Sequence, residues 1–77
     1  MIRELDSVVL TVNRPELGLL AGDVGTVVYV YGEGEAFEVE FVTLAGETLG
    51  VLTLPKEAIR PVEAGDLAHV RRLRGAA

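Results

Sequence analysis

The sequence contains no cysteine, a single serine and a single histidine. A chain without thiols forms neither a disulfide framework nor a zinc-thiolate site. Nucleophilic catalysis requires a hydroxyl or thiol beside a base. Ser7 is the only serine and His69 the only histidine, so the sequence offers few residues for such a pair. Glu33 and Glu35 share one predicted turn but lack the further ligands of a calcium loop. We therefore expect no enzymatic activity, no catalytic residue, no metal and no cofactor.

Long apolar runs are also missing. No stretch reaches the roughly 18 uncharged apolar residues that cross a membrane, and the acidic residues soon after Met1 do not fit a signal peptide. The sequence predicts a soluble, cytoplasmic protein that contacts no membrane. Asparagine occurs once and glutamine never. Scarcity of these thermolabile amides fits a heat-adapted source, and codon bias in a GC-rich genome explains it equally well.

The residues that are abundant are apolar: 49% of the 77 residues are hydrophobic, with twelve valines and eleven leucines. A chain of this length forms one domain and buries only about 60–65% of the surface that it exposes when unfolded. Without disulfides, its stability depends on nearly all of that apolar content or on a partner that covers more of it.

Alternating apolar and polar residues, separated by glycine and proline turns, predict an all-β fold. Pro55 begins a predicted single 3₁₀ turn that ends at Ile59. Five short strands with a one-turn helix before the last are typical of a small SH3-like antiparallel barrel. We assign residues 1–62 to this barrel and residues 63–77 to a C-terminal extension. The predicted strands are 6–12, 24–31, 37–41, 48–54 and 60–62, and Leu17, Leu19 and Leu20 are expected to fold back onto the core.

The C-terminal extension repeats a pattern found earlier in the chain. Residues 21–27 and 64–70 both read Ala-Gly-Asp, an aliphatic residue, two further residues and valine. We expect each aspartate to accept hydrogen bonds from nearby backbone amides and to start a strand. Gly22, Asp23 and Gly25 are therefore predicted turn residues. The extension is predicted to add a sixth strand, with a short helix or partial disorder as alternatives.

The Gly-Asp-x-Gly-x-Val turn at residues 22–27 resembles the turn of KOW segments in ribosomal and transcription proteins. Together with four further stretches it resembles the bacterial family called domain of unknown function 4926, over residues 2–62. The resemblance implies a small SH3-like barrel and no established activity. It also implies an antitoxin-like or immunity-like member of a two-gene pair. The four stretches are Ile2-Arg3-Glu4-Leu5-Asp6, Val8-Val9-Leu10-Thr11, Glu38-Val39-Glu40-Phe41 and Ile59-Arg60-Pro61-Val62.

The strand predicted at residues 24–31 is apolar on both faces, although a barrel has only one interior. Period-two alternation places Val27, Tyr29 and Tyr31 on one face. Because tyrosine has an apolar ring and a polar hydroxyl, it tolerates partial exposure to solvent, and we expect this face to point outward. Tyr29, Tyr31, Glu38 and Glu40 are the predicted binding residues for a basic or proline-containing segment of a protein partner. The alternative is that both tyrosines pack beneath the tail or beneath the loop at residues 15–20.

Charge is distributed unevenly along the chain. Residues 1–62 contain four basic and ten acidic side chains, which gives a net charge of −6. A surface of this sign repels a phosphate backbone, so nucleic-acid binding is disfavoured. The tail reverses the sign, and Arg71, Arg72 and Arg74 are candidate contacts to nucleic acid, to a second subunit or to the chain's own acidic surface.

These features favour a non-catalytic protein-interaction module that occludes a basic site on a partner, with opposite charge speeding the encounter. Two alternatives stay open. One is a KOW-like module associated with nucleic acid or the ribosome through the arginine-rich tail. The other is a self-assembling structural domain whose edge strands and tail pair across a two-fold axis. A homodimer or higher homo-oligomer is expected.

Overall fold

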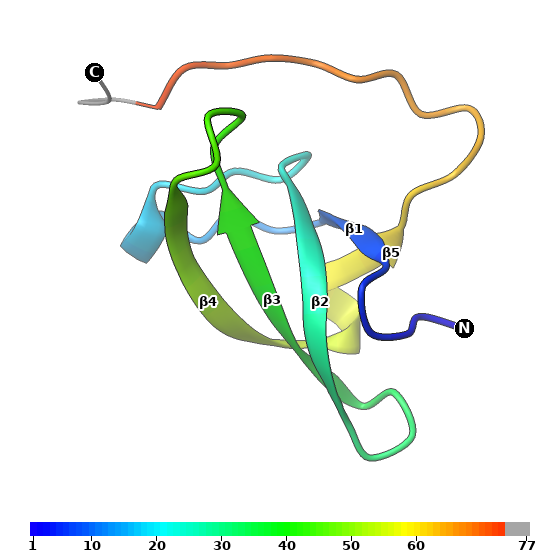
Figure 1. Cartoon of the computed structure of the whole chain (residues 1–77). Coiled ribbons are helices and arrows are strands. Elements are labelled where there is room, and N and C mark those ends of the chain that lie inside the picture. Colours follow the sequence, from blue (N-terminus) through cyan, green and yellow to red (C-terminus); the bar gives the residue numbers. More distant parts are fainter. Residues whose placement is uncertain (74–77) are drawn as a thin grey trace.

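The computed structural model describes residues 1–73. It is an all-β fold, as the alternation of apolar and polar residues predicted (Figure 1). Two single-turn 3₁₀ helices, η1 (Pro15–Leu17) and η2 (Lys56–Ala58), accompany the strands, and η2 lies directly before the last strand as expected. The strands are β1 (Ser7–Leu10), β2 (Val24–Tyr31), β3 (Ala36–Val42), β4 (Thr48–Pro55) and β5 (Ile59–Pro61).

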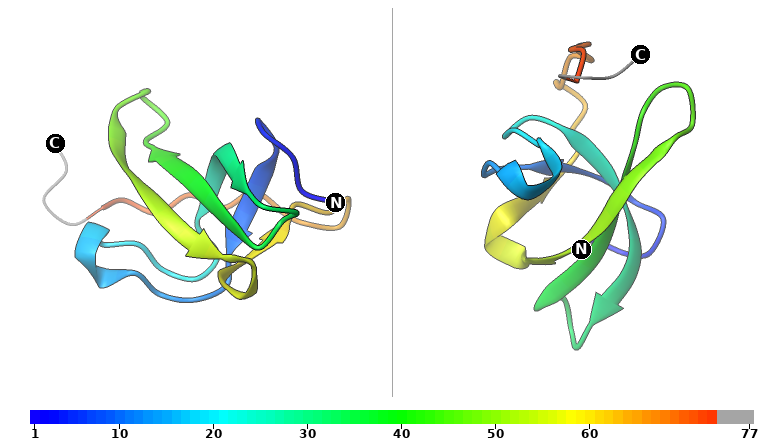
Figure 2. Two further views of the ribbon diagram at one scale, coloured as in Figure 1. Left: turned by 90° about the horizontal axis from the view of Figure 1, so that it is seen from below. Right: turned by 90° about the vertical axis from the view of Figure 1, so that its left-hand side faces the viewer.

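The five strands form one antiparallel sheet in the order β4-β3-β2-β1-β5. The first strand lies inside the sheet, between β2 and β5: Val8 of β1 lies opposite Gly25 of β2 on one side and Pro61 of β5 on the other. The sheet curls around the core (Figure 2), but in the described part of the chain no hydrogen-bonded ladder joins the edge strands β4 and β5. The predicted five antiparallel strands are therefore present, with a single 3₁₀ turn before the last, in a curled sheet that hydrogen bonds do not close within residues 1–73.

The core is built from the inward-pointing alternate residues of the strands. One buried leucine, Leu19, comes from the loop between β1 and β2, and Leu17 of η1 packs partly against the core. Leu20, which we also expected to fold back, is 47% exposed. The largest fully buried side chains are Phe41, Leu10, Leu54, Val8, Val27 and Val39.

A β-bulge in β2 decides which of its side chains face outward. The register with β3 shifts between Val27 and Tyr29, which leaves Val28 without a partner. Val27 is completely buried, whereas Tyr29 is 50% and Tyr31 40% exposed. The tyrosines point outward as predicted, but the outward position predicted for Val27 is wrong. One extra residue in the strand reverses the alternation, and period-two counting cannot detect it.

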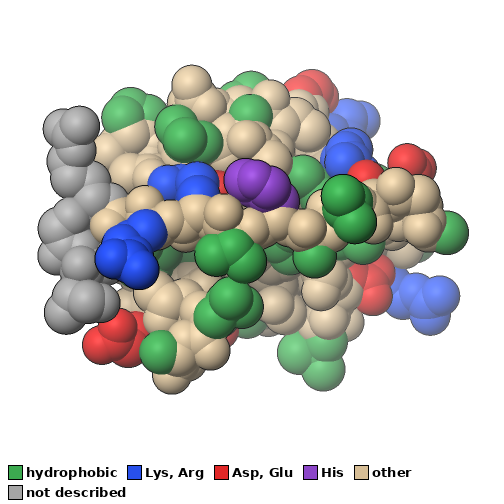
Figure 3. Space-filling model, turned by 90° about the horizontal axis from the view of Figure 1, so that it is seen from above, with side chains coloured by type: hydrophobic (Ala, Val, Ile, Leu, Met, Phe, Trp, Pro, Cys, Tyr) green, Lys and Arg blue, Asp and Glu red, His purple; other side chains and the backbone are tan. Residues whose placement is uncertain are grey.

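Residues 62–73 cross one end of the sheet without forming a strand or a helix (Figures 1 and 3). The sixth strand predicted here is not formed in the described part of the tail. Leu67 is 93% exposed, so its apolar side chain does not hold the tail on the sheet. Two ion pairs anchor the tail instead, Arg60 with Asp66 and Arg71 with Asp23. The tail is therefore attached by charge and not by sheet hydrogen bonds.

Candidate functional site

The outer face of the sheet, across β2, β3 and β4, carries an exposed pair of tyrosines. Tyr29 and Tyr31 are two residues apart on β2, so their side chains are neighbours on one face. Their ring centroids lie 4.9 Å apart at an interplanar angle of 72°, an edge-to-face contact. Since both rings stay exposed, neither is packed beneath the tail or beneath the loop at residues 15–20. The pair forms an aromatic surface that is open to a partner.

A carboxylate lies next to the tyrosines on the neighbouring strand. Glu38 of β3 is directly opposite Tyr29 in the sheet register. Its carboxylate accepts a hydrogen bond from the hydroxyl group of Tyr31. The hydroxyl of Thr53, which lies opposite Glu38 on β4, is 2.9 Å from both carboxylate oxygens. Hydroxyl groups from the two flanking strands, β2 and β4, therefore fix the orientation of this one acidic group.

A second carboxylate on β3 is held in a similar way. Glu40 accepts a hydrogen bond of 3.1 Å from the hydroxyl of Thr48 on β4. Thr48 and Thr53 were not predicted as site residues, because only the pairing of β3 with β4 brings their hydroxyl groups to the glutamates. We call the whole surface the acidic-aromatic face. It consists of Tyr29, Tyr31, Glu38, Glu40, Thr48 and Thr53.

No cation of residues 1–73 forms an ion pair with the carboxylates of this face. The hydroxyl groups that orient Glu38 and Glu40 are neutral donors, and the ion pairs found within residues 1–73 are the two that anchor the tail. The hydrogen bond to Glu38 raises the pKa of the Tyr31 phenol above its usual value of 10, because a nearby carboxylate favours the neutral phenol. The face thus combines oriented negative charge with exposed aromatic rings.

The Gly-Asp motif forms a tight turn before β2. The Asp23 carboxylate accepts the N–H of Leu20 at 2.8 Å, and the Asp23 N–H donates to the carbonyl of Leu20. Gly22 has a φ of +100°, a conformation that glycine adopts without strain. Gly25 lies inside β2, and its φ is not positive. It allows close packing instead, since a Cβ there would lie 2.6 Å from Val39.

The tail arginines lie in different surroundings. The Arg71 guanidinium donates to both carboxylate oxygens of Asp23, with Nε at 2.9 Å, and to the carbonyl of Gly18 at 3.0 Å. These bonds lower the pKa of Asp23 below its usual value. Arg72 is exposed, and Arg74 lies outside the described residues. Arg71 therefore binds the chain's own acidic surface, as one of the three alternatives proposed.

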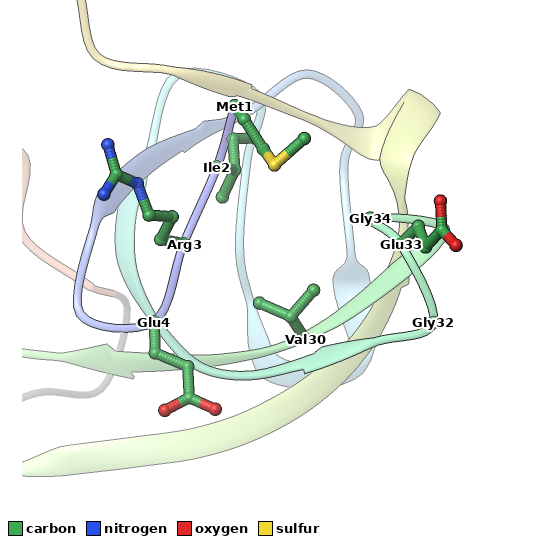
Figure 4. Close-up of a pocket in the computed structure, with 8 residues that line it drawn as sticks. All are labelled: Met1, Ile2, Arg3, Glu4, Val30, Gly32, Glu33 and Gly34. Carbon is green, nitrogen blue, oxygen red and sulfur yellow. The ribbon is translucent and has the colours of Figure 1, made fainter.

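A hollow of another kind lies between the N-terminal segment and the turn that joins β2 to β3 (Figure 4). It is an open pocket of about 240 Å³ with Ile2 and Val30 at its apolar centre. The charged side chains of Arg3, Glu4 and Glu33 point away from this centre (Figure 4). The pocket therefore lacks the convergent polar groups that orient a small ligand. Within residues 1–73, no group of three or more histidine or acidic side chains forms a metal site.

The fold and its exposed features define a small all-β domain, built on one five-stranded antiparallel sheet, with an acidic-aromatic face. The family model described as "Domain of unknown function (DUF4926)" matches residues 4–61. This match covers well over half of the 77 residues, so the chain belongs to the DUF4926 family. No curated protein and no solved structure is significantly similar to the chain. Among residues 1–73, no helix is long and apolar enough to span a bilayer.

Proposed function

We propose that the chain is a non-catalytic protein-interaction module whose acidic-aromatic face binds a basic or proline-containing segment of a partner protein. The observation that carries this proposal is the orientation of Glu38 by two neutral hydroxyls beside an exposed tyrosine pair. A guanidinium group suits such a surface, because it forms charge-assisted hydrogen bonds with carboxylates and stacks on aromatic rings. Proline side chains also pack well on exposed tyrosines.

The mechanism we propose is occlusion. The chain carries a net charge of −5, which accelerates its encounter with a basic partner. Once bound, the rigid sheet covers the partner's basic site and blocks its access to other molecules. An antitoxin-like or immunity-like member of a two-gene pair would act in this way. The first partner to test is therefore a basic protein whose gene lies next to the gene that encodes this chain.

The proposal is tested by titrating the full ¹⁵N-labelled chain with two short synthetic peptides. One peptide is rich in arginine and proline, and the other has glutamate in place of each arginine. We expect only the arginine peptide to shift the amide signals of β2 and β3, and we expect the shifts to weaken with added salt. Tyr29→Ala should weaken binding of the arginine peptide, and Glu38→Gln should weaken it about fivefold.

The matched control is Glu47→Gln, which makes the same change of charge in the turn between β3 and β4. The side chain of Glu47 makes no hydrogen bond or ion pair within the described residues. This variant should therefore bind the arginine peptide nearly as well as the unmodified chain. Equal losses in the two glutamine variants would show that only the overall charge matters, and the proposed face would then be wrong.

Self-association is a second candidate function, and one observation favours it. The edge strand β4 has eight residues without a single charge, whereas the other edge, β5, is three residues long and contains Arg60 and Pro61. Long uncharged edges tend to pair with another strand. Antiparallel pairing of β4 with β4 of a second copy would form a two-fold dimer. Light scattering at micromolar concentration tests this, and Val51→Lys should convert such a dimer to monomers.

A further inference from the structure

Three turns of the chain share one pattern of hydrogen bonds. In each turn, an aspartate N–H donates to the carbonyl of the residue three positions earlier. The aspartate carboxylate in turn accepts the N–H of that earlier residue. The turns span residues 3–6, 20–23 and 63–66 and end at Asp6, Asp23 and Asp66. The third position is glycine in the second and third turns, but it is Leu5 in the first.

Leucine is unfavourable in the backbone conformation that this position adopts in the first turn. Leu5 has a φ of +73°, in the left-handed region, where a bulky side chain is strained. Gly22, at the same position of the second turn, has a φ of +100° and no such strain. The Leu5 side chain is also 80% exposed, so burial in the core does not offset the strain. A strained and exposed leucine, where glycine would fit, indicates a role outside the fold.

Leu5 lies at the margin of the acidic-aromatic face. Its N–H donates to the carbonyl of Val27 at 2.7 Å, and the Val27 N–H donates to the carbonyl of Asp6 at 2.9 Å. These bonds attach the turn to β2 directly before the bulge at Val28, and the turn runs beside β2 in Figure 1. Val28 and Tyr29 are both exposed. The backbone of Leu5 therefore lies beside β2 on the side away from β3, next to the exposed residues Val28 and Tyr29.

We propose that Leu5 is a partner-contact residue that selects an apolar side chain in the bound segment. This inference rests on the proposed function of the acidic-aromatic face. An apolar residue of the partner packs on Leu5 and Val28, while a neighbouring basic residue reaches Glu38 on the other side of β2. The partner segment thus carries an apolar residue beside its basic residues, a narrower chemistry than positive charge alone.

The experiment compares two arginine-rich peptides that differ only in having leucine or serine at one position. The full chain should bind the leucine peptide more tightly than the serine peptide. Leu5→Gly should weaken binding of the leucine peptide about tenfold and abolish the preference, because the apolar contact is lost. Its urea midpoint should be no lower than that of the unmodified chain, since glycine relieves the left-handed strain.

Two further variants serve as controls. Leu5→Ala removes the leucine contact but keeps most of the strain, so it should lose the same affinity without gaining stability. Leu44→Gly removes a 93% exposed leucine from the turn between β3 and β4, and it should leave the affinity for both peptides unchanged. Together, these variants separate the contact made by Leu5 from its effect on folding.

The outcomes distinguish this inference from the proposed function. If Leu5→Gly lowers the urea midpoint more than Leu44→Gly does, Leu5 is a packing residue and the inference is wrong. If Leu5→Gly binds the leucine peptide normally while Tyr29→Ala does not, the face binds without Leu5, and only the inference is overturned. If the unmodified chain binds neither arginine-rich peptide, the proposed function fails and the inference fails with it.

Discussion

Gly25 offers the sharpest test of the packing in this small barrel. An alanine Cβ at this position would lie 2.6 Å from Cγ1 of Val39, 2.8 Å from Cε1 of Phe41 and 3.0 Å from the carbonyl oxygen of Glu40. Val39 and Phe41 are buried core residues, so neither side chain has free space to move into. The carbonyl belongs to the backbone of β3, which is held between β2 and β4, and cannot rotate away. We therefore expect Gly25→Ala to force β2 and β3 apart.

The size of this effect follows from the number of close contacts. Inserting a methyl group into a packed core costs about 1–3 kcal/mol, and three simultaneous contacts place Gly25→Ala near the upper end, at about 3 kcal/mol. A domain of this length has a free energy of unfolding of roughly 4–11 kcal/mol. With an m-value of about 1 kcal/mol per molar in urea, the midpoint should fall by about 3 M.

Urea unfolding followed by circular dichroism measures this change. The matched control is Gly65→Ala: a Cβ at Gly65 has no atom within 4 Å and its φ is not positive, so its effect should stay below about 0.5 kcal/mol. Val39→Ala should partly relieve the clash, so the double variant with Gly25→Ala should lose less stability than the two single losses combined. If Gly25→Ala unfolds within about 0.5 kcal/mol of the unmodified chain, the close approach of β2 and β3 is wrong.

Three further predictions concern the charged groups. Glu38→Gln should lower the pKa of Tyr31 toward 10, because the carboxylate that raises this pKa is removed. The pKa is measured from the NMR signals of the Tyr31 ring, and an unchanged value would exclude the hydrogen bond between Tyr31 and Glu38. Arg71→Ala should speed proteolysis of residues 67–73, because the ion pair with Asp23 anchors this segment. It should lower the free energy of unfolding by less than about 1 kcal/mol, since the pair is partly exposed. An unchanged rate of proteolysis would show that Arg71 does not hold the tail. The pKa of Asp66 is lowered from 3.8 to about 2 by its arginine partner, and that of Asp23 is also lowered. Since these folded-state values lie below the unfolded value, tail anchoring should be complete above about pH 4 and be lost as the pH falls toward 2. Tail NMR signals that stay unchanged down to pH 2 would contradict this assignment.

Local sequence patterns were sufficient to predict most strands. The strand expected at residues 24–31 is β2 (Val24–Tyr31), and the one expected at residues 48–54 is β4 (Thr48–Pro55). These segments are set by side-chain alternation and by the glycine turns between them, which act over a few residues. The single 3₁₀ turn before the last strand was predicted for the same reason, since Pro55 marks its start.

Predictions that depended on contacts between distant segments were less accurate. The tail repeats the Ala-Gly-Asp pattern that precedes β2, which led us to predict a strand, yet within residues 62–73 it pairs with no sheet edge and Leu67 stays exposed. Val27 was wrongly assigned to the outer face by period-two counting. The bulge at Val28 reverses the alternation, and it arises only from the pairing of β2 with β3. Neither result can be read from spacing alone, because both depend on which strand lies alongside.

The candidate site shows the same division. Exposure of Tyr29 and Tyr31 was predictable, because two apolar faces cannot both fit inside one barrel and tyrosine tolerates water. The threonine hydroxyls that orient Glu38 and Glu40 could not be predicted, since they come from the facing strand β4. The strained Leu5 was also missed, because a backbone conformation with positive φ is conspicuous in a sequence only where glycine occupies it.

The sequence by itself determined an all-β chain with short strands, an acidic barrel and a tail of opposite charge, because alternation, turn residues and charge counts are properties of neighbouring residues. Only the tertiary structure decided what the charged groups contact. In the folded chain, Arg71 binds Asp23, which is forty-eight residues away in the sequence. Within residues 1–73, no cation forms an ion pair with the carboxylates of Glu38 and Glu40. These pairings depend on strand register and on the path of the tail, which follow from packing of the whole chain.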